Sequence, residues 1–530
     1  MHPQTEAPTS PVEPAAPLAT PPALSLRAYL VTSGATPIVI AVVIVGMFLP
    51  VVLSTYAFID DYPLLWTAVS GEPSAFFGRS IFYEYAVGGR PLAGLLTAWS
   101  YTAAGGIDAL QFVRLAGVVG IAAVALQLHW TLVRSGFGRA LAALIAVLVC
   151  SMPAFQLTAA WTVLFHTPLA MLLAGGASVL AAAAIDAPHR LRNVRMIGAT
   201  AMLLASLMIY QPAAMFFWVV LAIAIVGERN DARRAMRTTL AHLVAGGVAL
   251  ALAFVSAKVF VAFFDNGGTA EPRGRLTTDI LGKAGWFLDQ PLYQTLNLFD
   301  LTPSPRLAAV VAAVAAGGML LWLVRRSPQP LLYIVIALAL IPLSFLPNLI
   351  VAENHADIRS QIALSPLVTL YVCLGALGLW LTLRDWIEPH LRIGALRVAE
   401  RAALAIATIA VGGSVVAAAS HVTNLIVVPQ TTELRMIRSQ VAALPVGTTR
   451  VAFVLTPYQT TMAPLINHEI GLPIASLRWV LQPLVRLILH ERGSLPPWAP
   501  RPIVDVLPSN TTTYPVGVPV IDVRGIRRFR

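Results

Sequence analysis

Two adjacent carboxylates, Asp60 and Asp61, follow the first long apolar run of the chain, which covers residues 36–58. A run of about 20 apolar residues can cross a hydrocarbon core of about 30 Å as a helix. Acidic side chains just beyond such a crossing can take a proton, hold a cation or mark an interface. Their role depends on the side of the membrane that they face, and the other apolar runs and the basic clusters predict that side.

The composition of the chain is that of a polytopic membrane protein. Of its 530 residues, 57% are hydrophobic and 12% are charged, whereas soluble domains carry about 25% charged residues. The net charge of +11 comes mostly from short basic clusters between apolar runs, where Lys and Arg orient helices. Nucleic-acid binding is therefore not expected. Cys150 and Cys373 both fall inside apolar runs and are expected to be packing residues.

The basic clusters predict how the chain crosses the membrane. The positive-inside rule places five such segments in the cytoplasm: 134–139, 189–195, 229–237, 325–326 and 384–401. Because an even number of spans must join any two of them, we predict eleven transmembrane helices, with the N-terminus inside and the C-terminus outside. The same even-number rule (parity) predicts that residues 91–105 lie along the outer surface of the membrane without crossing it. Residues 196–227 are short for the two spans that parity requires there, at about 20 residues each.

This topology divides the chain into three parts. Residues 1–30 are rich in Pro, Ala and Thr and are expected to form a disordered cytoplasmic tail. Residues 31–428 form the transmembrane domain, with outer loops at 57–109, 265–304 and 351–362. Residues 429–530 mix a helical stretch with three strand-like runs bounded by Pro and Gly, which predicts a small extracytoplasmic α/β domain.

Most of the informative polar residues fall in the outer loops, whereas the cytoplasmic loops are short and basic. The predicted spans carry no carboxylate near their midplane. An ion-coupled transporter usually has some, although a charge at the bilayer centre costs about 2.5–3.5 kcal/mol. Five polar residues near the predicted span ends are interpreted as interfacial anchors: Arg114, His129, His166, His242 and Lys258. Function is therefore expected at the outer face.

Two elements of the first outer loop resemble a known family. The sequence FIDDYPLLW is followed after about 30 residues by GGRPLAGLL. Together they resemble the GT-C superfamily of integral membrane glycosyltransferases, and most of all the GtrII-type bacterial glucosyltransferases. The resemblance covers residues 57–133; beyond them it rests on hydropathy and on the outer C-terminal module. It implies a GT-C-like fold and transfer of a sugar from a polyprenyl-phosphate carrier.

In that family an acid of the first outer loop acts as general base, in some members with a divalent cation nearby. By position, Asp60 or Asp61 would be the base, because an acceptor hydroxyl needs a carboxylate to take its proton. Asp60 is slightly preferred. Asp61 is also the candidate ligand if a cation such as Mg or Mn binds. The alternative is that one acid faces solvent and the other caps the helix expected to begin near residues 62–65.

The leaving group of such a donor is a lipid phosphate, which guanidinium groups bind bidentately. Arg90 and Arg359 are the candidate ligands, the latter within AENHADIRS, whose Glu353 and His355 are further substrate-binding candidates. Each has a simpler alternative. Arg90 could pair with Glu84 and merely order the loop, Arg359 could anchor beside lipid headgroups, and a lone loop histidine is more often solvated.

The sequence thus predicts a multi-pass protein of the cell inner (plasma) membrane. It would move a hexosyl or pentosyl group from a polyprenyl-phosphate donor to an extracytoplasmic envelope glycan, lipid or protein. The rival prediction is a non-catalytic transporter or envelope-assembly component whose outer domain binds partners. A third is a relative that keeps the fold without the activity.

Overall fold

The structure of the protein is a computed structural model. It describes residues 34–71, 80–228, 231–264, 275–301, 305–390, 393–457, 466, 469–493 and 502–525. The tail expected at 1–30 and residues 265–274 and 302–304 of the second outer loop lie outside the described residues.

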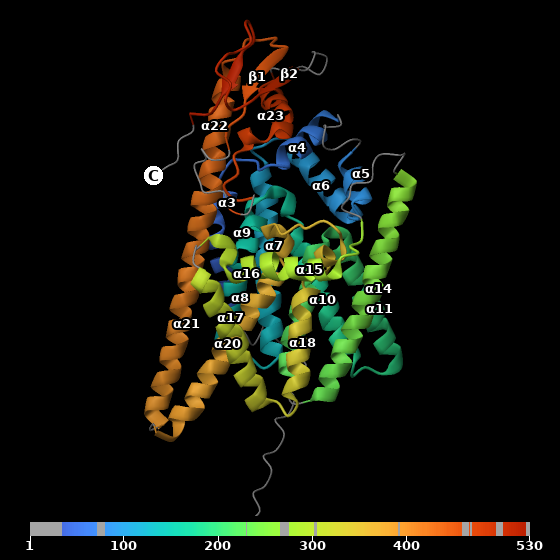
Figure 1. The fold of residues 1–530 in the computed structure, drawn as a ribbon, viewed down its shortest axis with the longest axis vertical. Helices are drawn as coiled ribbons and strands as arrows, with labels where there is room; N and C mark the ends of the chain where they lie inside the picture. Colours follow the sequence, from blue (N-terminus) through green and yellow to red (C-terminus); the bar gives the residue numbers. More distant parts are fainter. Residues whose placement is uncertain are drawn as a thin grey trace, which may run out of the picture.

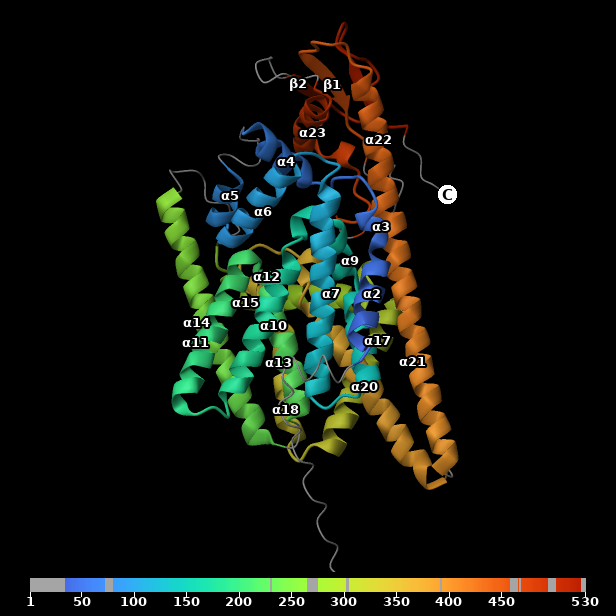
Figure 2. The same ribbon diagram turned by 180° about the vertical axis from the view of Figure 1, so that it is seen from behind.

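Long helices run side by side as a bundle, and a smaller module projects from one end of it (Figures 1 and 2). The bundle is built from α2 (Thr36–Met47), α3 (Leu49–Val52), α7 (Leu110–Arg134), α8 (Arg139–Cys150), α9 (Pro153–Ala160), the 3-10 helix η1 (Thr162–Leu164), α10 (Thr167–Ala184), α11 (His189–Ile209), α12 (Gln211–Ala214), α13 (Phe216–Gly227), α14 (Ala232–Phe264), α17 (Pro305–Arg326), α18 (Pro330–Leu343), α19 (Leu346–Ile350), α20 (Leu364–Ile387), the 3-10 helix η6 (Glu388–His390) and α21 (Ile393–His421).

Shorter helices cover the end of the bundle that faces the module. They are α4 (Asp61–Ser70), α5 (Ile81–Val87), α6 (Pro91–Ala104), α15 (Ile280–Phe287), the π-helix η3 (Leu288–Leu292), α16 (Tyr293–Leu296) and the 3-10 helices η4 (Leu298–Asp300) and η5 (Ile358–Gln361). α6 occupies the segment predicted to lie on the surface. It has 14 residues and lies beside α4 and α5 above the bundle (Figure 1).

The polytopic helical fold predicted from hydropathy is confirmed. Six helices in the described chain are long and apolar enough to cross a membrane, and a seventh crossing results if α8 and α9, bent by 62°, count as one span. Three further apolar helices are shorter: Thr36–Met47, Gln211–Gly227 and Pro330–Leu343. The count of eleven spans stays a prediction.

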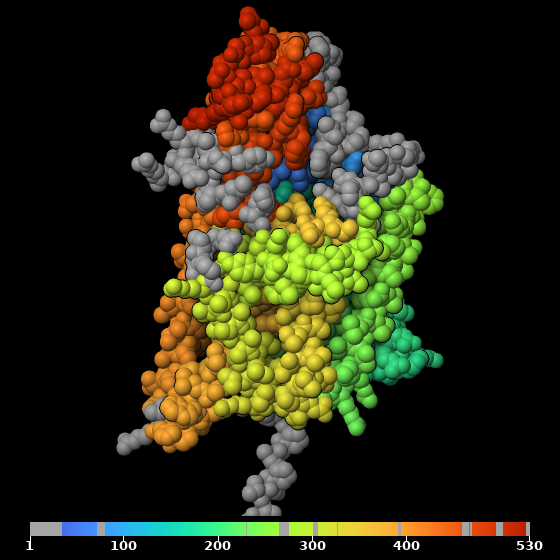
Figure 3. All heavy atoms as spheres, viewed as in Figure 1, coloured from blue at the N-terminus to red at the C-terminus, as the bar shows by residue number. Residues whose placement is uncertain are grey.

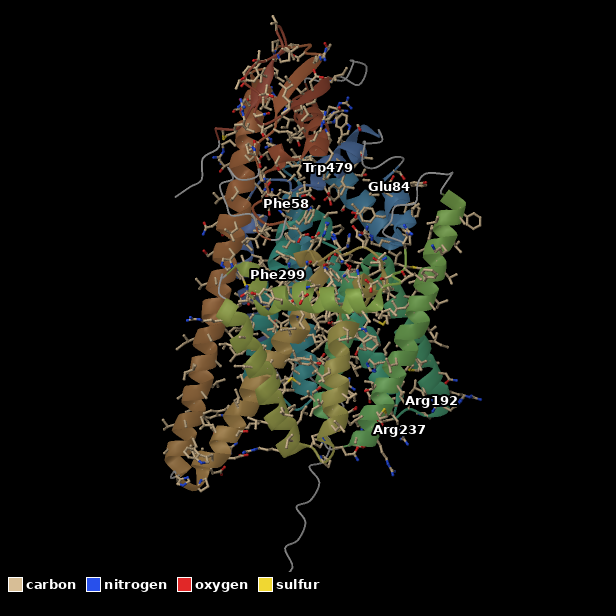
Figure 4. The ribbon with its side chains drawn as sticks, in the orientation of Figure 1. Phe58, Glu84, Arg192, Arg237, Phe299 and Trp479 are labelled. Carbon is tan, nitrogen blue, oxygen red and sulfur yellow. The ribbon has the colours of Figure 1, made fainter. Side chains whose placement is uncertain are left out.

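The basic clusters share one end of the bundle. The connections from α7 to α8, α10 to α11, α13 to α14, α17 to α18 and α20 to α21 all lie at the end opposite the C-terminal module (Figures 1 and 2). Figure 4 accordingly places Arg192 and Arg237 at that end, and Phe58, Glu84 and Trp479 toward the other. This arrangement agrees with a single basic face, and its assignment to the cytoplasm stays a prediction.

Glycines allow α17 and α20 to cross at close range. A Cβ atom placed on Gly318 would collide with the carbonyl oxygen of Gly375, and one on Gly378 would collide with the carbonyl oxygen of Gly318. Between helices in lipid, small residues permit the backbone approach that dispersion contacts require. These glycines therefore fix the spacing of this helix pair.

We expect Gly318→Ala to lower the melting temperature of the purified protein, because the added methyl group must push two backbones apart at a cost of about 1–3 kcal/mol. Gly317→Ala is the matched control, since a Cβ there has nothing within 4 Å. Alanine favours a helix over glycine by about 1 kcal/mol, so this control should melt at the same temperature or slightly higher. Equal melting temperatures for the two variants in a thermal unfolding assay would show that the crossing is not tightly packed.

The C-terminal module is a small α/β unit, as the strand-like runs predict. It contains α22 (Val428–Ala442), β1 (Arg450–Val454), the 3-10 helix η9 (Ile474–Ser476), α23 (Arg478–Glu491), β2 (Ile503–Leu507) and β3 (Val520–Asp522). The strands form a parallel sheet in the order β2-β1-β3. α21 continues without a break through the π-helix η7 (Val422–Val427) into α22, so one helical rod joins the bundle to the module.

Polar contacts tie this module to the first outer loop. Glu491 accepts a hydrogen bond from the backbone N–H of Ile107 at 2.6 Å, and Arg438 pairs with both Asp108 and Glu491 at 2.9 Å. Within the module, buried Glu433 accepts from the backbone of η9. The module is therefore held against the residues that precede α7.

Candidate active site at the module end of the bundle

Arg114 of α7 organises the segment that leads to the acidic pair. Its guanidinium is buried and donates to the carbonyl oxygens of Val51 at 3.1 Å, Ser54 at 2.6 Å and Tyr56 at 2.8 Å. It also lies 4.0 Å from the centre of the Tyr56 ring. These carbonyls lie at and beyond the end of α3, where a helix leaves its last acceptors without partners. The interfacial anchoring predicted for Arg114 is therefore wrong.

The predicted anchoring of three histidines is also wrong, because each is buried inside the protein. His129 contacts a backbone carbonyl, and His242 contacts the hydroxyl of Ser178 at 2.9 Å. His166 is 4% exposed, and neither ring nitrogen has a hydrogen-bond partner in the described chain. Lys258 lies on an exposed position of α14, so its anchoring role stays a prediction.

Asp61 is a fully buried carboxylate whose two oxygens both accept hydrogen bonds. Oδ1 accepts from the Tyr101 hydroxyl at 2.5 Å and from the backbone N–H of Val163 at 3.1 Å; Oδ2 accepts from the backbone N–H of Phe58 at 2.8 Å. Burial raises the pKa of Asp61 to about 6, although these hydrogen bonds and the charge of Arg114 oppose the rise. Asp61 therefore joins the start of α4 to α6 and to η1.

The backbone just before the pair is strained. Ile59 has φ of 41°, a left-handed conformation that costs a β-branched residue about 1–3 kcal/mol. Such outliers persist where the surroundings impose them, and they cluster at functional sites. Here the strained residue directly precedes the two aspartates, one of which is buried while the other is accessible.

Asp60 is the accessible member of the pair and faces a guanidinium. Its Oδ2 lies 3.9 Å from Nη1 of Arg359, whose Nη2 lies 3.5 Å from Asp357 and whose Nε lies 3.1 Å from Glu469. The Asp60 side chain is 21% exposed. The guanidinium also lies 4.7 Å from the Trp161 ring centre. Three carboxylates from three separate segments thus converge on one arginine.

Glu469 is a site residue that sequence reasoning missed. It belongs to the C-terminal module, its side chain is 4% exposed, and it also accepts the backbone N–H of Arg359 at 3.3 Å. Burial and the neighbouring Asp357 raise the pKa of Glu469, and Arg359 opposes that rise. No motif marks this residue, because its partner lies 110 positions away in the chain.

Arg90 lies in the same region as this network. Its guanidinium is 5.2 Å from the ring centre of Tyr85. Gln211 donates to the carbonyl oxygen of Gly89 at 3.2 Å, and the hydroxyl of the adjacent Tyr210 donates to the carbonyl oxygen of Arg359 at 3.2 Å. The structure therefore brings together Arg90 of the first outer loop and Arg359 of the third. Figure 3 shows atoms of the first outer loop, in blue, recessed between the C-terminal module and the residues around 350, in gold.

The ion pair between Arg90 and Glu84, considered as a simpler role for this arginine, is not formed. Within the described ranges no carboxylate lies within 4 Å of the Arg90 guanidinium. The turn before Arg90 needs glycine because Gly89 has φ of 74°. The carbonyl oxygen of Gly89 also accepts a hydrogen bond from the side chain of Gln211 at 3.2 Å. Arg90 thus keeps a positive charge that no neighbouring acid in the described chain balances.

His355 and Glu353, the other predicted substrate-binding residues, lie on the same loop as Arg359. His355 Nε2 is 2.6 Å from Asp357, so the imidazole borders the network. Glu353 contributes its backbone carbonyl to Lys283 at 2.6 Å. In the described part of the chain, its carboxylate is not among those that pair with Arg359.

A divalent cation does not fit at Asp61, the predicted metal ligand. Protein donors already occupy both of its oxygens. Among the residues that the structure describes, no three His, Cys, Asp or Glu side chains form a group that could hold a metal ion. The side chain of Asp60 does not cap α4 either, so the predicted capping role is not seen.

Asp61 gives the fold a pH dependence whose sign follows from burial. Its pKa rises from 3.8 to about 6 on folding, so the folded state binds the proton more tightly. This tighter binding stabilises the folded state by about 3 kcal/mol at low pH. The contribution is complete below about pH 4 and is lost as pH rises through about 6. We expect the melting temperature of the wild type to fall across this window and that of Asp61→Asn to lack this fall. Parallel curves in a pH series would contradict the assignment.

Comparison with known proteins gives structural neighbours. No protein-family model and no curated protein matches the chain. The crystal structure of ArnT from Cupriavidus metallidurans bound to undecaprenyl phosphate is similar to it, with 15% identity, a TM-score of 0.42, and coverage of 91% of this chain and 90% of that one. The same protein in the apo state has 14% identity, a TM-score of 0.39, and coverage of 90% and 89%.

Proposed function

We propose that the chain is an integral membrane glycosyltransferase of GT-C type. It would transfer a hexosyl or pentosyl group from a polyprenyl-phosphate donor to an extracytoplasmic glycan, lipid or protein. One observation carries the proposal: the accessible carboxylate of Asp60 and the guanidinium of Arg90, which pairs with no acid in the described chain, lie in one region at the end of the helical bundle that faces the C-terminal module. Glycosyl transfer from a lipid phosphate needs a base of this kind and a cation of this kind.

Asp60 is the proposed general base. As the acceptor oxygen attacks the anomeric carbon, the hydroxyl proton passes to the Asp60 carboxylate, and the bond from that carbon to the phosphate oxygen breaks with its electrons. Asp61 is a poor candidate for this step because its oxygens are occupied and buried. We assign Asp61 a structural role, in which it holds Asp60 at the start of α4.

Arg90 is the proposed ligand of the donor phosphate. Each of the three guanidinium nitrogens of Arg359 faces a carboxylate, so the acids around it outnumber its charge. A phosphate approaching that cluster would meet net negative charge, and like charges in a poorly hydrated site repel strongly. Arg359 is therefore assigned the role of orienting Asp60. His355, at the edge of the same network, is assigned a contact with the substrate.

Replacing Arg90 with alanine should weaken binding of polyprenyl phosphate about 10- to 100-fold, because a charge-assisted hydrogen bond contributes about 1.5–3 kcal/mol. Arg359→Lys should change that affinity by less than about threefold, since the arginine does not contact the phosphate in this assignment. Titration of purified protein with a short-chain polyprenyl phosphate measures both. A larger loss in Arg359→Lys than in Arg90→Ala would reverse the two roles.

The decisive experiment is incubation of the purified protein in lipid vesicles with radiolabelled polyprenyl-phosphate hexoses and pentoses and with envelope glycolipid or glycan acceptors. We expect transfer from one donor class by the wild type and transfer slowed about 10²- to 10⁴-fold in Asp60→Asn. A parallel reaction with EDTA tests the divalent cation, through which we propose no step. A protein that binds polyprenyl phosphate but transfers no sugar from any donor would favour the rival assignment as an envelope-assembly component.

A further inference from the structure

The segment formed by α15, η3 and α16 lies across the bundle instead of along it (Figure 1). Its outward side is strongly apolar. Ile280 is 75% exposed, Leu281 is 86% exposed and Leu288 is 58% exposed. Leu281 and Leu288 are seven positions apart, two helical turns, and only small residues lie between them on that side. A stripe of this kind facing water would cost free energy in a soluble protein.

The inward side of the same segment is packed. Trp286 and Phe287 are buried against Phe345, which lies between α18 and α19, and against Leu364 and Val368 of α20. Residues 283, 286, 287, 291 and 295 are all buried, which is the spacing of a single helical face. The segment therefore has one face fixed on the bundle and one face without a partner in the described chain.

Hydrogen bonds connect this segment to both ends of the loop that carries Arg359. At one end, Lys283 Nζ donates to the carbonyl oxygen of Glu353 at 2.6 Å and to Asn354 Oδ1 at 2.8 Å. At the other end, the Thr295 hydroxyl donates to Gln361 Oε1 at 2.5 Å. Backbone pairing of residues 275–277 with residues 350–352 reinforces the first end. Asp357 and Arg359 lie between these two attachments.

We infer that residues 280–296 form an in-plane strap: its apolar stripe inserts into the bilayer leaflet nearest the C-terminal module, and its packed face holds the Arg359 loop. The bilayer is the occupant that the surroundings favour. The helices that flank the strap in the chain, α14 and α17, expose apolar side chains along membrane-spanning lengths, among them Val259 and Val310. Asp289 and Gln290, polar and exposed, follow the stripe directly. An apolar stripe with a polar edge is what a headgroup boundary accommodates.

The membrane contact is tested by placing a nitroxide label at one position at a time in a Cys150→Ala, Cys373→Ala background. The labelled variants are Leu281→Cys and Leu288→Cys. Val516→Cys, at a fully exposed position of the module, is the control for a label in water. In vesicles of phosphatidylethanolamine and phosphatidylglycerol, we expect positions 281 and 288 to be reached by oxygen and shielded from a water-soluble nickel chelate. Nickel access equal to that at 516 would overturn the inference, as would shielding from both reagents, which would place a second protein copy or another segment there.

The link to the site is tested by hydrogen exchange, which does not require the proposed activity. The test uses the double variant Leu281→Asn/Leu288→Asn in the same vesicles. Its amides at residues 357–361 should exchange about tenfold faster than those of the wild type, because the strap no longer fixes them. Exchange in residues 140–146 of α8, at the other end of the bundle, is the internal control and should not change. Unaltered exchange at 357–361 would overturn the coupling. Because neither readout measures sugar transfer, failure of this inference is distinct from failure of the proposed function.

Discussion

Asp60→Asn should abolish most sugar transfer while leaving the protein as stable as the wild type. The amide is nearly isosteric with the carboxylate, whose Oδ2 lies 3.9 Å from Arg359, but it cannot take the proton of the acceptor hydroxyl. Positioned general bases contribute about 10²- to 10⁴-fold to rate, so kcat/KM should fall within that range. The measurement is initial-rate transfer from the labelled donor, with melting temperature recorded on the same preparation.

Asp61→Asn is the control for Asp60→Asn because it makes the same carboxylate-to-amide change at the adjacent residue. The Tyr101 hydroxyl and two backbone N–H groups donate to the carboxylate of the wild type. The amide nitrogen of the variant would therefore face another donor. We expect this variant to lose stability, because a buried donor left unsatisfied costs about 1–3 kcal/mol. Full transfer activity in Asp60→Asn, or a stable but inactive Asp61→Asn, would interchange the roles of the two aspartates.

The arrangement of helices and strands could largely be predicted, because it depends on patterns local to the sequence. Apolar runs and basic clusters predicted the helical bundle, while the position of α6 along the membrane surface stays a prediction. Strand-like runs bounded by Pro and Gly predicted the three strands of the C-terminal module. Each of these signals comes from residues within one element, so no long-range contact had to be known.

The contacts of the candidate site could be predicted only in part. The positions of Asp60, Arg90 and Arg359 followed from the resemblance and from topology. The burial of Arg114 did not, because position near a span end does not distinguish a side chain that reaches the interface from one that binds carbonyls inside. Glu469 was missed because folding brings its module onto a loop that is distant in the chain.

The participation of the C-terminal module has a direct consequence for Arg359. The Glu469 carboxylate accepts a hydrogen bond from the backbone N–H of Arg359 and forms an ion pair with its guanidinium at 3.1 Å. Without Glu469, the Nε side of the guanidinium loses its ion-pair partner, while Asp60 and Asp357 stay beside the other two nitrogens, so the arginine can change orientation. The position of Arg359, and through it that of Asp60, therefore depends on a domain that does not itself contain the proposed base.

Glu469→Ala should therefore lower kcat/KM for transfer and should do so through Arg359. In a double-mutant cycle with Arg359→Ala, we expect a coupling energy of about 1–3 kcal/mol, because the two residues share one contact. Glu491→Ala is the matched control: it also removes an acid that attaches the module to the first outer loop, but its partners are Ile107 and Arg438. Its effect should add to that of Arg359→Ala.

Glu469→Gln separates the charge of this residue from its shape. The pKa of Glu469 is raised by burial, so the wild-type pH profile of kcat/KM should contain a titration above the usual range of a glutamate, and the Gln variant should lack it. If the module served only as a passive support, Glu469→Ala and Glu491→Ala would behave alike, and both cycles with Arg359→Ala would be additive. A shift of the pH profile confined to the 469 variants is the outcome that a role in orienting Arg359 requires.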